Sequence, residues 1–200
     1  FDPTLLDSTI VLPHNDKYLD CAQNYLDHQI ERARKMNAKV FRAWSFHGSD
    51  WVKDFYTKNG FEISLLEYIS ELNLDKFFIS DFESSISSFK KSSYVILNLE
   101  ELKKLNKDWK LKLFDLWIRI EQDVPSDLNL NIEFDLWKSN VFRPWFKEED
   151  FYIVLDGDKW VALSTYIRSL RSRDKISTEL TGVLPEYRRQ SICSAVKIHA

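Results

Sequence analysis

The chain has 200 residues, of which 44% are hydrophobic and 14% aromatic, and its formal net charge is −3. This length and apolar content suffice for one large or two small packed domains. Lys and Arg are spread along a slightly acidic chain, which argues against a nucleic-acid binder. The apolar runs, such as Phe151–Leu155, are far shorter than the ~20 residues of a membrane-spanning helix, so we expect no membrane span.

The cysteine content and the chain ends bear on where the protein works. The only cysteines are Cys21 and Cys193, and the sequence has neither an Asn-x-Ser/Thr site nor a signal-peptide pattern. These features predict a reducing, cytoplasmic location. Because the chain begins with Phe1 and stops inside an expected helix, we expect a piece of a longer protein, truncated at both ends.

The first part of the sequence predicts alternating strands and helices. Leu19, Ala22 and Leu26 recur at the spacing of an amphipathic helix, and Asn59–Gly60 is a helix-stop signal. In chain order we expect a strand at Ser8–Pro13, a helix at Tyr18–Met36, a strand at Ala38–Phe46, a helix within Ser49–Phe61 and a long strand or bent strand pair at Phe61–Leu74.

Residues 75–93 are rich in Ser and Lys and poor in apolar side chains, which is typical of a linker. The domain prediction is therefore a first domain at residues 1–80, a linker at 81–93 and a second domain at 94–200. In the second domain we expect a strand from Tyr94, a helix at about Glu100–Gln122, further helix after Asn131, and strands at Asp150–Asp156, Lys159–Ile167 and Lys175–Val183. Asp156–Lys159 has the composition of a hairpin turn.

One short sequence occurs twice. The tripeptide Val-Leu-Pro stands at Val11–Pro13 and again at Val183–Pro185, and each copy leaves an expected strand and enters an expected amphipathic helix. The first part of the chain has the elements that should follow this helix, and the second part has those that should precede it. The pattern indicates two related domains, each incomplete.

The segment TGVLPEYRRQSICSAVK, Thr181–Lys197, resembles the acetyl-CoA motif of the GNAT N-acetyltransferase superfamily, in which a strand ending V-x-P leads into Q/R-x-x-G-x-G/A and a helix. DFYTKNGFE, Asp54–Glu62, is similar to the closing helix and strand of that family. The resemblance implies an α/β fold with a mixed, largely antiparallel GNAT-type sheet flanked by helices. It also implies an acetyltransferase that moves acetyl from acetyl-CoA directly to an amine of a small molecule or peptide.

The charges around this motif suit an anion. A helix N-terminus presents unpaired N–H groups and partial positive charge, so Arg188 and Arg189 at such a position favour a bound phosphate or pyrophosphate between them and the amides. With the family implied, the anion is the coenzyme A pyrophosphate. The implied donor site comprises Thr181, Gly182, Val183, Arg188, Arg189, Gln190, Ser191, Ile192 and Cys193.

Two comparisons qualify this prediction. The first copy carries Asp16 and Asp20 at the matching places, and carboxylates there repel phosphate, so we expect no coenzyme A binding by the first domain. In the second copy, Ser191 and Cys193 replace the small residues of the family motif. The Ser191 side chain either donates a hydrogen bond to the phosphate or crowds it.

Acyl transfer to an amine needs a proton acceptor, a polarised carbonyl and a proton donor for the leaving thiolate. Glu179, which alternates with Thr181 and Val183 along the strand, is the candidate base, with a solvent-facing or salt-bridged Glu179 as the alternative. A backbone N–H near Val183 would polarise the thioester carbonyl. Tyr56 stands where the family has its proton-donating tyrosine, and a structural aromatic is the alternative.

The histidines and Cys193 lack the sequence features of a metal site or a catalytic nucleophile. His14, His28, His47 and His199 show no metal-ligand spacing, so we assign no metal site. Cys193 lacks a recognisable histidine partner and is interpreted as a small packing residue rather than a nucleophile. The alternative to an acetyltransferase is a non-catalytic protein that binds acyl-CoA or a partner. The acceptor amine and the oligomeric state cannot be inferred.

Overall fold

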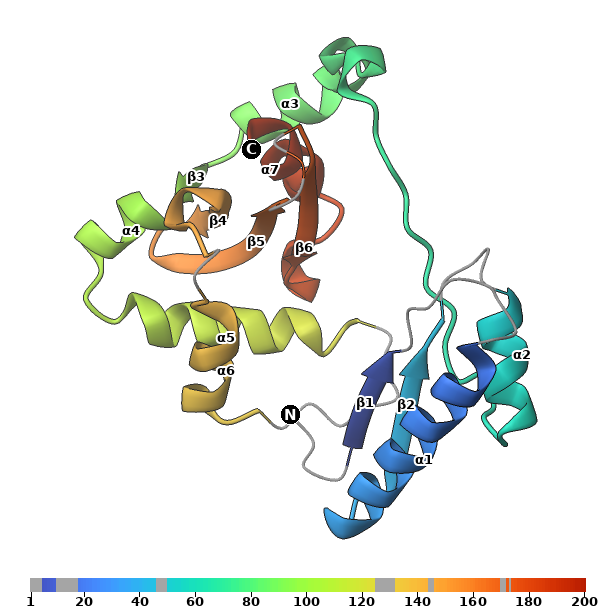
Figure 1. The fold of residues 1–200 in the computed structure, drawn as a ribbon. Coiled ribbons are helices and arrows are strands. Elements are labelled where there is room, and N and C mark those ends of the chain that lie inside the picture. The colour runs from blue at the N-terminus through green and yellow to red at the C-terminus, as the bar shows by residue number, and fades with distance from the viewer. Residues whose placement is uncertain are drawn as a thin grey trace. The chain divides into compact units, whose positions relative to one another are not determined.

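The computed structural model describes residues 5–9, 18–45, 50–124, 132–143, 146–169, 172 and 174–200, and Figure 1 shows its ribbon. The protein is mixed α/β. The contacts between Cα atoms divide the chain into two compact units. Unit 1 contains the described residues up to Tyr68, and unit 2 contains those from Ile69 onward.

Unit 1 is a strand-helix-strand-helix unit. Its first strand is Leu5–Thr9, whereas the sequence predicted Ser8–Pro13, and residues 10–13 lie outside the described residues. Its two strands are parallel, with Leu5 opposite Val40 and Thr9 opposite Trp44. One helix carries buried Ala22, Leu26 and Ala33, so its apolar stripe faces the core. The elements are β1 (Leu5–Thr9), α1 (Leu19–Lys35), β2 (Val40–Trp44) and α2 (Asp50–Lys58). The first Val-Leu-Pro copy, Asp16 and Ser49 lie outside the described residues.

The predicted end of α2 is confirmed. Gly60 has φ +84°, a left-handed conformation, and its N–H donates to the Thr57 carbonyl at 3.1 Å. The Phe61 N–H reaches back to the Tyr56 carbonyl, also at 3.1 Å. This pair of bonds caps the last carbonyls of the helix, as a glycine just past a helix end commonly does.

The long strand predicted at Phe61–Leu74 is wrong. Residues 61–73 form neither helix nor strand, and their apolar side chains are largely exposed, Tyr68 at 91%. Apolar alternation makes a strand only where a neighbouring strand satisfies its N–H and C=O groups. In the described part of the chain this segment pairs with no strand.

Unit 2 contains a four-stranded antiparallel sheet flanked by helices. The strands follow one another in the order β3-β4-β5-β6. Gly157, at φ +58°, forms the predicted hairpin turn between β4 and β5. The strands are β3 (Tyr94–Asn98), β4 (Phe151–Asp156), β5 (Lys159–Arg168) and β6 (Ile176–Val183).

The single helix predicted at Glu100–Gln122 is in fact two helices. The Asn106 side chain accepts a hydrogen bond from the Asp108 N–H at 3.0 Å, and such a turn competes with helix propagation. The first helix has a capping box between Asn98 and Glu101. The helices of unit 2 are α3 (Glu83–Lys90), α4 (Leu99–Leu105), α5 (Trp109–Glu121), α6 (Phe134–Val141) and α7 (Ile192–His199).

Two separate apolar cores cover the sheet of unit 2. One holds side chains of α4, α5 and α6 with Ile153 and Leu163 of the sheet. The other holds Val154, Val161 and Val183 of the sheet with side chains of α7. Phe89 of α3 packs against this second core, so residues 81–93, predicted as a linker, include a helix that packs in unit 2.

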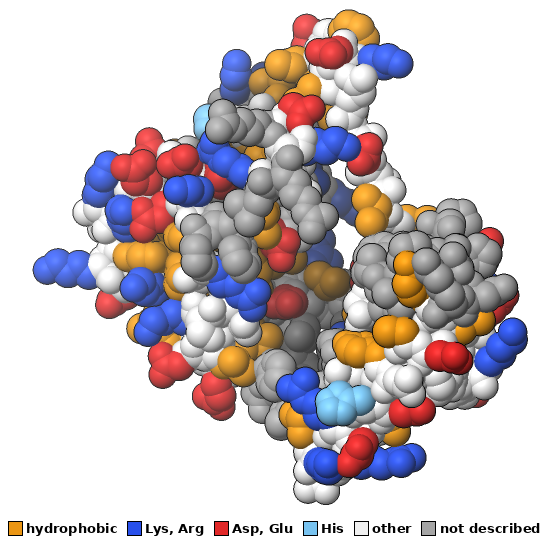
Figure 2. Space-filling view, in the orientation of Figure 1, with side chains coloured by type: hydrophobic (Ala, Val, Ile, Leu, Met, Phe, Trp, Pro, Cys, Tyr) orange, Lys and Arg blue, Asp and Glu red, His pale blue; other side chains and the backbone are white. Residues whose placement is uncertain are grey.

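The visible surface of unit 2 carries charges of both signs, and the described helices are not of the membrane-spanning kind. On the face seen in Figure 2, Lys and Arg side chains of unit 2 are interspersed with Asp and Glu side chains. Among the helices of the described ranges, none combines the length and the apolar character needed to cross a bilayer.

Candidate functional site

The predicted donor-site residues lie on one continuous strand-loop-helix segment of unit 2. β6 ends at Val183, a short 3₁₀ turn follows at Pro185–Tyr187, and α7 begins at Ile192. Arg188 and Arg189 therefore lie in the loop before α7, whereas the sequence predicted them at the start of the helix. The loop is longer than expected because Pro185 starts the separate 3₁₀ turn.

β6 is the outermost strand of the described sheet, and one of its edges is open. The Leu184 N–H donates to the Val161 carbonyl of β5 at 2.9 Å. Because hydrogen-bonded positions alternate along an antiparallel pair, the main-chain groups of Val183 face away from β5. Consistent with this, the Val183 carbonyl accepts a hydrogen bond from Arg188 Nε at 3.1 Å rather than from β5. The Val183 N–H points to the same open side.

A pocket of about 310 Å³ lies between this end of β6 and the C-terminal end of α5. It brings together five of the predicted donor-site residues with three residues that the sequence did not single out. Its lining comprises Ile120, Asp123, Val124, Thr181, Gly182, Val183, Arg188 and Cys193.

Gly182 allows α5 to approach β6 closely. A Cβ atom at Gly182 would lie 2.2 Å from Cγ2 of Ile120 and 3.2 Å from its Cβ. Any side chain here would push the α5 end away from the strand. A second tether is the ion pair between Arg119 and Glu186, at 3.1 Å.

Arg188 joins both walls of the pocket. Its Nε bonds to the Val183 carbonyl, and its Nη2 forms an ion pair with the carboxylate of Asp123. Within the described part of the chain, the side chain of the adjacent Arg189 makes neither a hydrogen bond nor an ion pair. The two arginines thus differ: one is engaged and one is available.

The backbone before α7 is left-handed at two non-glycine residues, Arg189 at φ +60° and Ser191 at φ +62°. Ser191 occupies the place where the resembling motif has glycine, the residue that adopts this conformation without strain. Among the described residues, no carbonyl or side chain accepts from the N–H groups of residues 189–194. Successive free N–H groups in such a turn form an anion-binding concavity.

The side chains of the other predicted donor-site residues have different surroundings. The Gln190 side chain accepts from the Tyr94 hydroxyl at 2.5 Å, and the Thr181 hydroxyl lies 2.9 Å from that of Ser164. The Ile192 side chain is buried in the core, so only its backbone is available. Cys193 is exposed and lines the pocket.

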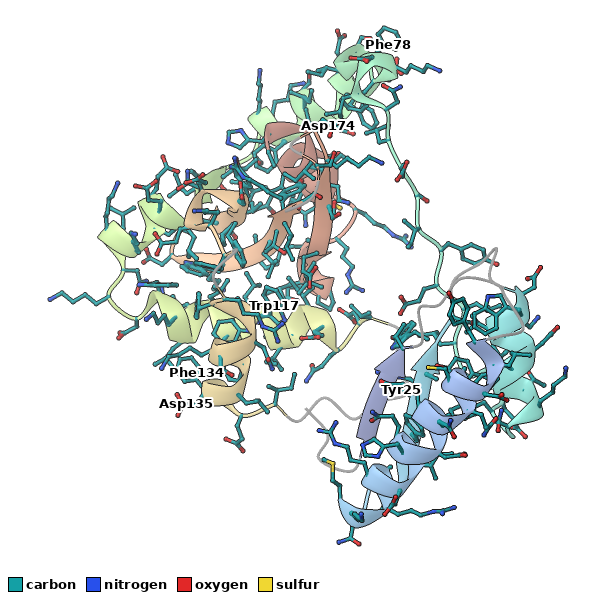
Figure 3. The ribbon with its side chains drawn as sticks, viewed as in Figure 1. Tyr25, Phe78, Trp117, Phe134, Asp135 and Asp174 are labelled. Carbon is teal, nitrogen blue, oxygen red and sulfur yellow. The ribbon has the colours of Figure 1, made fainter. Side chains whose placement is uncertain are left out.

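Glu179, the candidate base, is exposed on β6, and a second carboxylate lies near it. The register of β6 shifts between the pairs at Thr181 and Thr178, so simple alternation does not extend to Glu179. Burial raises the pKa of Glu121, at the end of α5, and the charge of Glu179 raises it further. Trp117 is labelled in Figure 3. Its indole N–H donates to Glu121 at 2.7 Å and opposes this rise of the pKa.

Sequence reasoning missed Glu121, although its spacing from Trp117 was visible. Residues four apart on a helix share a face, so a partly buried tryptophan can hold a carboxylate one turn later. Trp117 itself packs on the sheet, stacked against Phe151 with ring centroids 6.3 Å apart. That contact fixes the indole, and the indole in turn orients the carboxylate.

Tyr56 belongs to unit 1, whereas all other predicted site residues belong to unit 2. It is buried, and its ring contacts Phe61 with centroids 5.0 Å apart and Phe55 at 5.6 Å. Its predicted role as a proton donor stays a prediction. His14 and His47 lie outside the described residues, and no group of three or more His, Cys, Asp and Glu in the remainder is arranged to hold a metal ion.

No protein-family model matches this chain, and no curated protein matches it.

Proposed function

We propose that the protein is a GNAT-type N-acetyltransferase that transfers acetyl from acetyl-CoA directly to an amine of a small molecule or peptide. The observation that carries the proposal is the segment from β6 to α7. An open strand edge, a left-handed loop with free N–H groups and a pocket meet there. The four-stranded antiparallel sheet with helices on both faces is consistent with the fold that the resemblance implies.

The loop before α7 offers what a pyrophosphate requires. Free backbone N–H groups donate to phosphate oxygens, the helix start adds partial positive charge, and α7 has no acidic residue in its first turn. The available Arg189 side chain adds a full charge and can bind phosphate in a bidentate manner. We therefore assign the phosphates of the donor to residues 188–193.

The open edge of β6 offers what the reacting carbonyl requires. The Val183 N–H, directed away from β5, would donate to the thioester oxygen as negative charge develops on it. The acceptor nitrogen would lose a proton to Glu179 or Glu121 and attack the carbonyl carbon. The carbon–sulfur bond would then break, and the leaving thiolate would take a proton. The resemblance gives that role to a tyrosine, and Tyr56, which stands at the matching place of the motif, belongs to unit 1.

Ser191 favours the non-catalytic alternative, a protein that binds acyl-CoA or a partner without turnover. Its side chain stands where the family motif lets backbone approach the phosphate without a Cβ atom. A site crowded in this way can keep its ligand and lose the alignment that transfer needs.

The exposed, free thiols of Cys21 and Cys193 support a reducing compartment, and we propose a cytoplasmic location. The two-domain interpretation also remains a proposal, with coenzyme A binding confined to the second domain.

Calorimetric titration with coenzyme A, followed by an assay of thiol release from acetyl-CoA with a panel of amines, tests the function. Binding together with amine-dependent thiol release supports the enzyme. Binding without release for any amine class supports the non-catalytic alternative. The absence of coenzyme A binding overturns the enzyme and the acyl-CoA-binding form of the alternative.

A further inference from the structure

Arg188, which the proposed donor site needs, is held by an acid in the structure. Its Nη2 pairs with the Asp123 carboxylate, while its Nε bonds to the Val183 carbonyl at 3.1 Å. Both charged residues line the same pocket. The ion pair therefore links the residue after the end of α5 to the loop after β6.

Each partner of this pair stands near a helix end of its own sign. Asp123 follows the C-terminus of α5, where its N–H donates to the Ile120 carbonyl at 3.1 Å. A helix C-terminus carries partial negative charge and disfavours an acid, and the N-terminus of α7 likewise disfavours Arg188. Pairing the two relieves both conflicts. An anion at the start of α7 would relieve the conflict of Arg188 equally well.

The pair is open to solvent, with side-chain exposures of 47% for Arg188 and 46% for Asp123. Exposed ion pairs of this kind contribute little to stability. The pyrophosphate of the donor, which carries two negative charges in all and also receives the free N–H groups of the loop, is the stronger partner for the same guanidinium.

We propose that Asp123 is a gate on the donor site: it holds Arg188 until a phosphate group of the donor displaces its carboxylate. The inference rests on the proposed function of unit 2, because it names a regulation of that same site. Displacement need not detach α5 from the sheet. The contact of Ile120 with Gly182 and the Arg119–Glu186 pair remain as separate tethers.

The test compares Asp123→Asn with Asp115→Asn in the full chain, using coenzyme A and inorganic pyrophosphate as titrants. Both variants remove one negative charge near α5, but exposed Asp115 does not line the pocket that contains Arg188. Asp123→Asn should bind both titrants about two- to fivefold more tightly than the wild type, the range expected for removing a weak competing ion pair. Asp115→Asn should match the wild type.

A second variant, Arg188→Gln, completes the cycle. The gain from Asp123→Asn should vanish in the Arg188→Gln background, because no guanidinium is left to release. Equal affinities of Asp123→Asn and Asp115→Asn, or a gain that survives in the Arg188→Gln background, would overturn the gate.

The two proposals can fail separately. If the wild type binds coenzyme A but Asp123→Asn brings no gain, the donor site stands and the gate is wrong. If coenzyme A does not bind but Asp123→Asn tightens pyrophosphate binding, Asp123 still controls anion binding at Arg188, and the proposed acetyltransferase function is wrong. If neither titrant binds to any variant, both proposals are wrong.

Discussion

The first helix of unit 1, α1, and the last helix of unit 2, α7, differ in the charge of their first turns. α1 of unit 1 carries Asp20 in its first turn, whereas the first turn of α7 in unit 2 has no acidic residue. A carboxylate in the first turn offsets the partial positive charge of the free N–H groups. The partial positive charge at the start of α1 is therefore offset by Asp20, whereas that at the start of α7 is available to an anion.

Reversing the charges of the α7 loop should have the largest effect on this difference. Arg188→Glu combined with Arg189→Glu should weaken coenzyme A binding at least tenfold, about 1.4 kcal/mol, because attraction for phosphate becomes repulsion. Calorimetry on the full chain measures the change. Asp20→Asn is the matched control in unit 1, and it should leave the affinity unchanged. Unchanged affinity in the arginine variant would contradict the site assignment.

Replacing one glycine in each unit by alanine should reduce the stability of the two units by different amounts. Gly182→Ala in unit 2 should destabilise that unit by about 1–3 kcal/mol, because the new methyl group meets Ile120. Gly60→Ala in unit 1 meets no atom within 4 Å and should cost only the ~1 kcal/mol of a left-handed alanine. Hydrogen exchange resolved by residue assigns each loss to its unit. A smaller loss for Gly182→Ala than for Gly60→Ala would contradict the close α5–β6 packing.

Ser191→Gly separates the backbone effect from the ligand effect. Relief of the left-handed serine should stabilise unit 2 by up to about 1 kcal/mol after the entropy cost of glycine in the unfolded chain. If the side chain crowds the phosphate, coenzyme A binding also tightens, whereas weaker binding shows that the hydroxyl is a ligand. Asn37→Gly, at φ +54° in unit 1, is the control that should change stability without changing affinity.

Glu121→Gln should have the smallest effect, and it concerns pH. The pKa of Glu121 is raised by burial, so its contribution to stability is complete below its ordinary value of 4.5 and is lost as the pH rises through the raised pKa. Glutamine keeps an acceptor for the Trp117 indole and removes the titration. Urea unfolding between pH 4 and 7 should show a shallower fall in stability for the variant. Identical profiles for the two proteins would contradict the burial of this carboxylate.

Sequence patterns predicted the elements of unit 2 well where the signal was local. The hairpin at Gly157 and the strands around it follow from turn composition and apolar alternation. The misses are also instructive. The break at Asn106 depends on one side-chain hydrogen bond, and the failed strand after Phe61 depends on a partner strand, which no local pattern can report.

The sequence predicted only the part of the candidate site that is continuous in the chain. The order of strand, loop and helix from Thr181 to Cys193 is visible in the sequence, and the structure brings the ends of this segment to one pocket. The exact start of α7 was misjudged because Pro185 opens a separate 3₁₀ turn. Neither Asp123 nor Glu121 could be assigned to the site, because nothing near either residue in the sequence marks the strand that it faces.

By itself the sequence determined which residues are apolar at helical or alternating spacing, where glycine or asparagine ends an element, and that two arginines stand near a helix N-terminus. These are properties of neighbouring residues, and local backbone preference is enough to express them. Only the tertiary structure decided that Arg188 pairs with Asp123, 65 residues away, that Ile120 fills the space above Gly182, and that the free edge of β6 carries Val183. Those contacts depend on how the sheet and α5 pack together, and no short stretch of sequence contains that information.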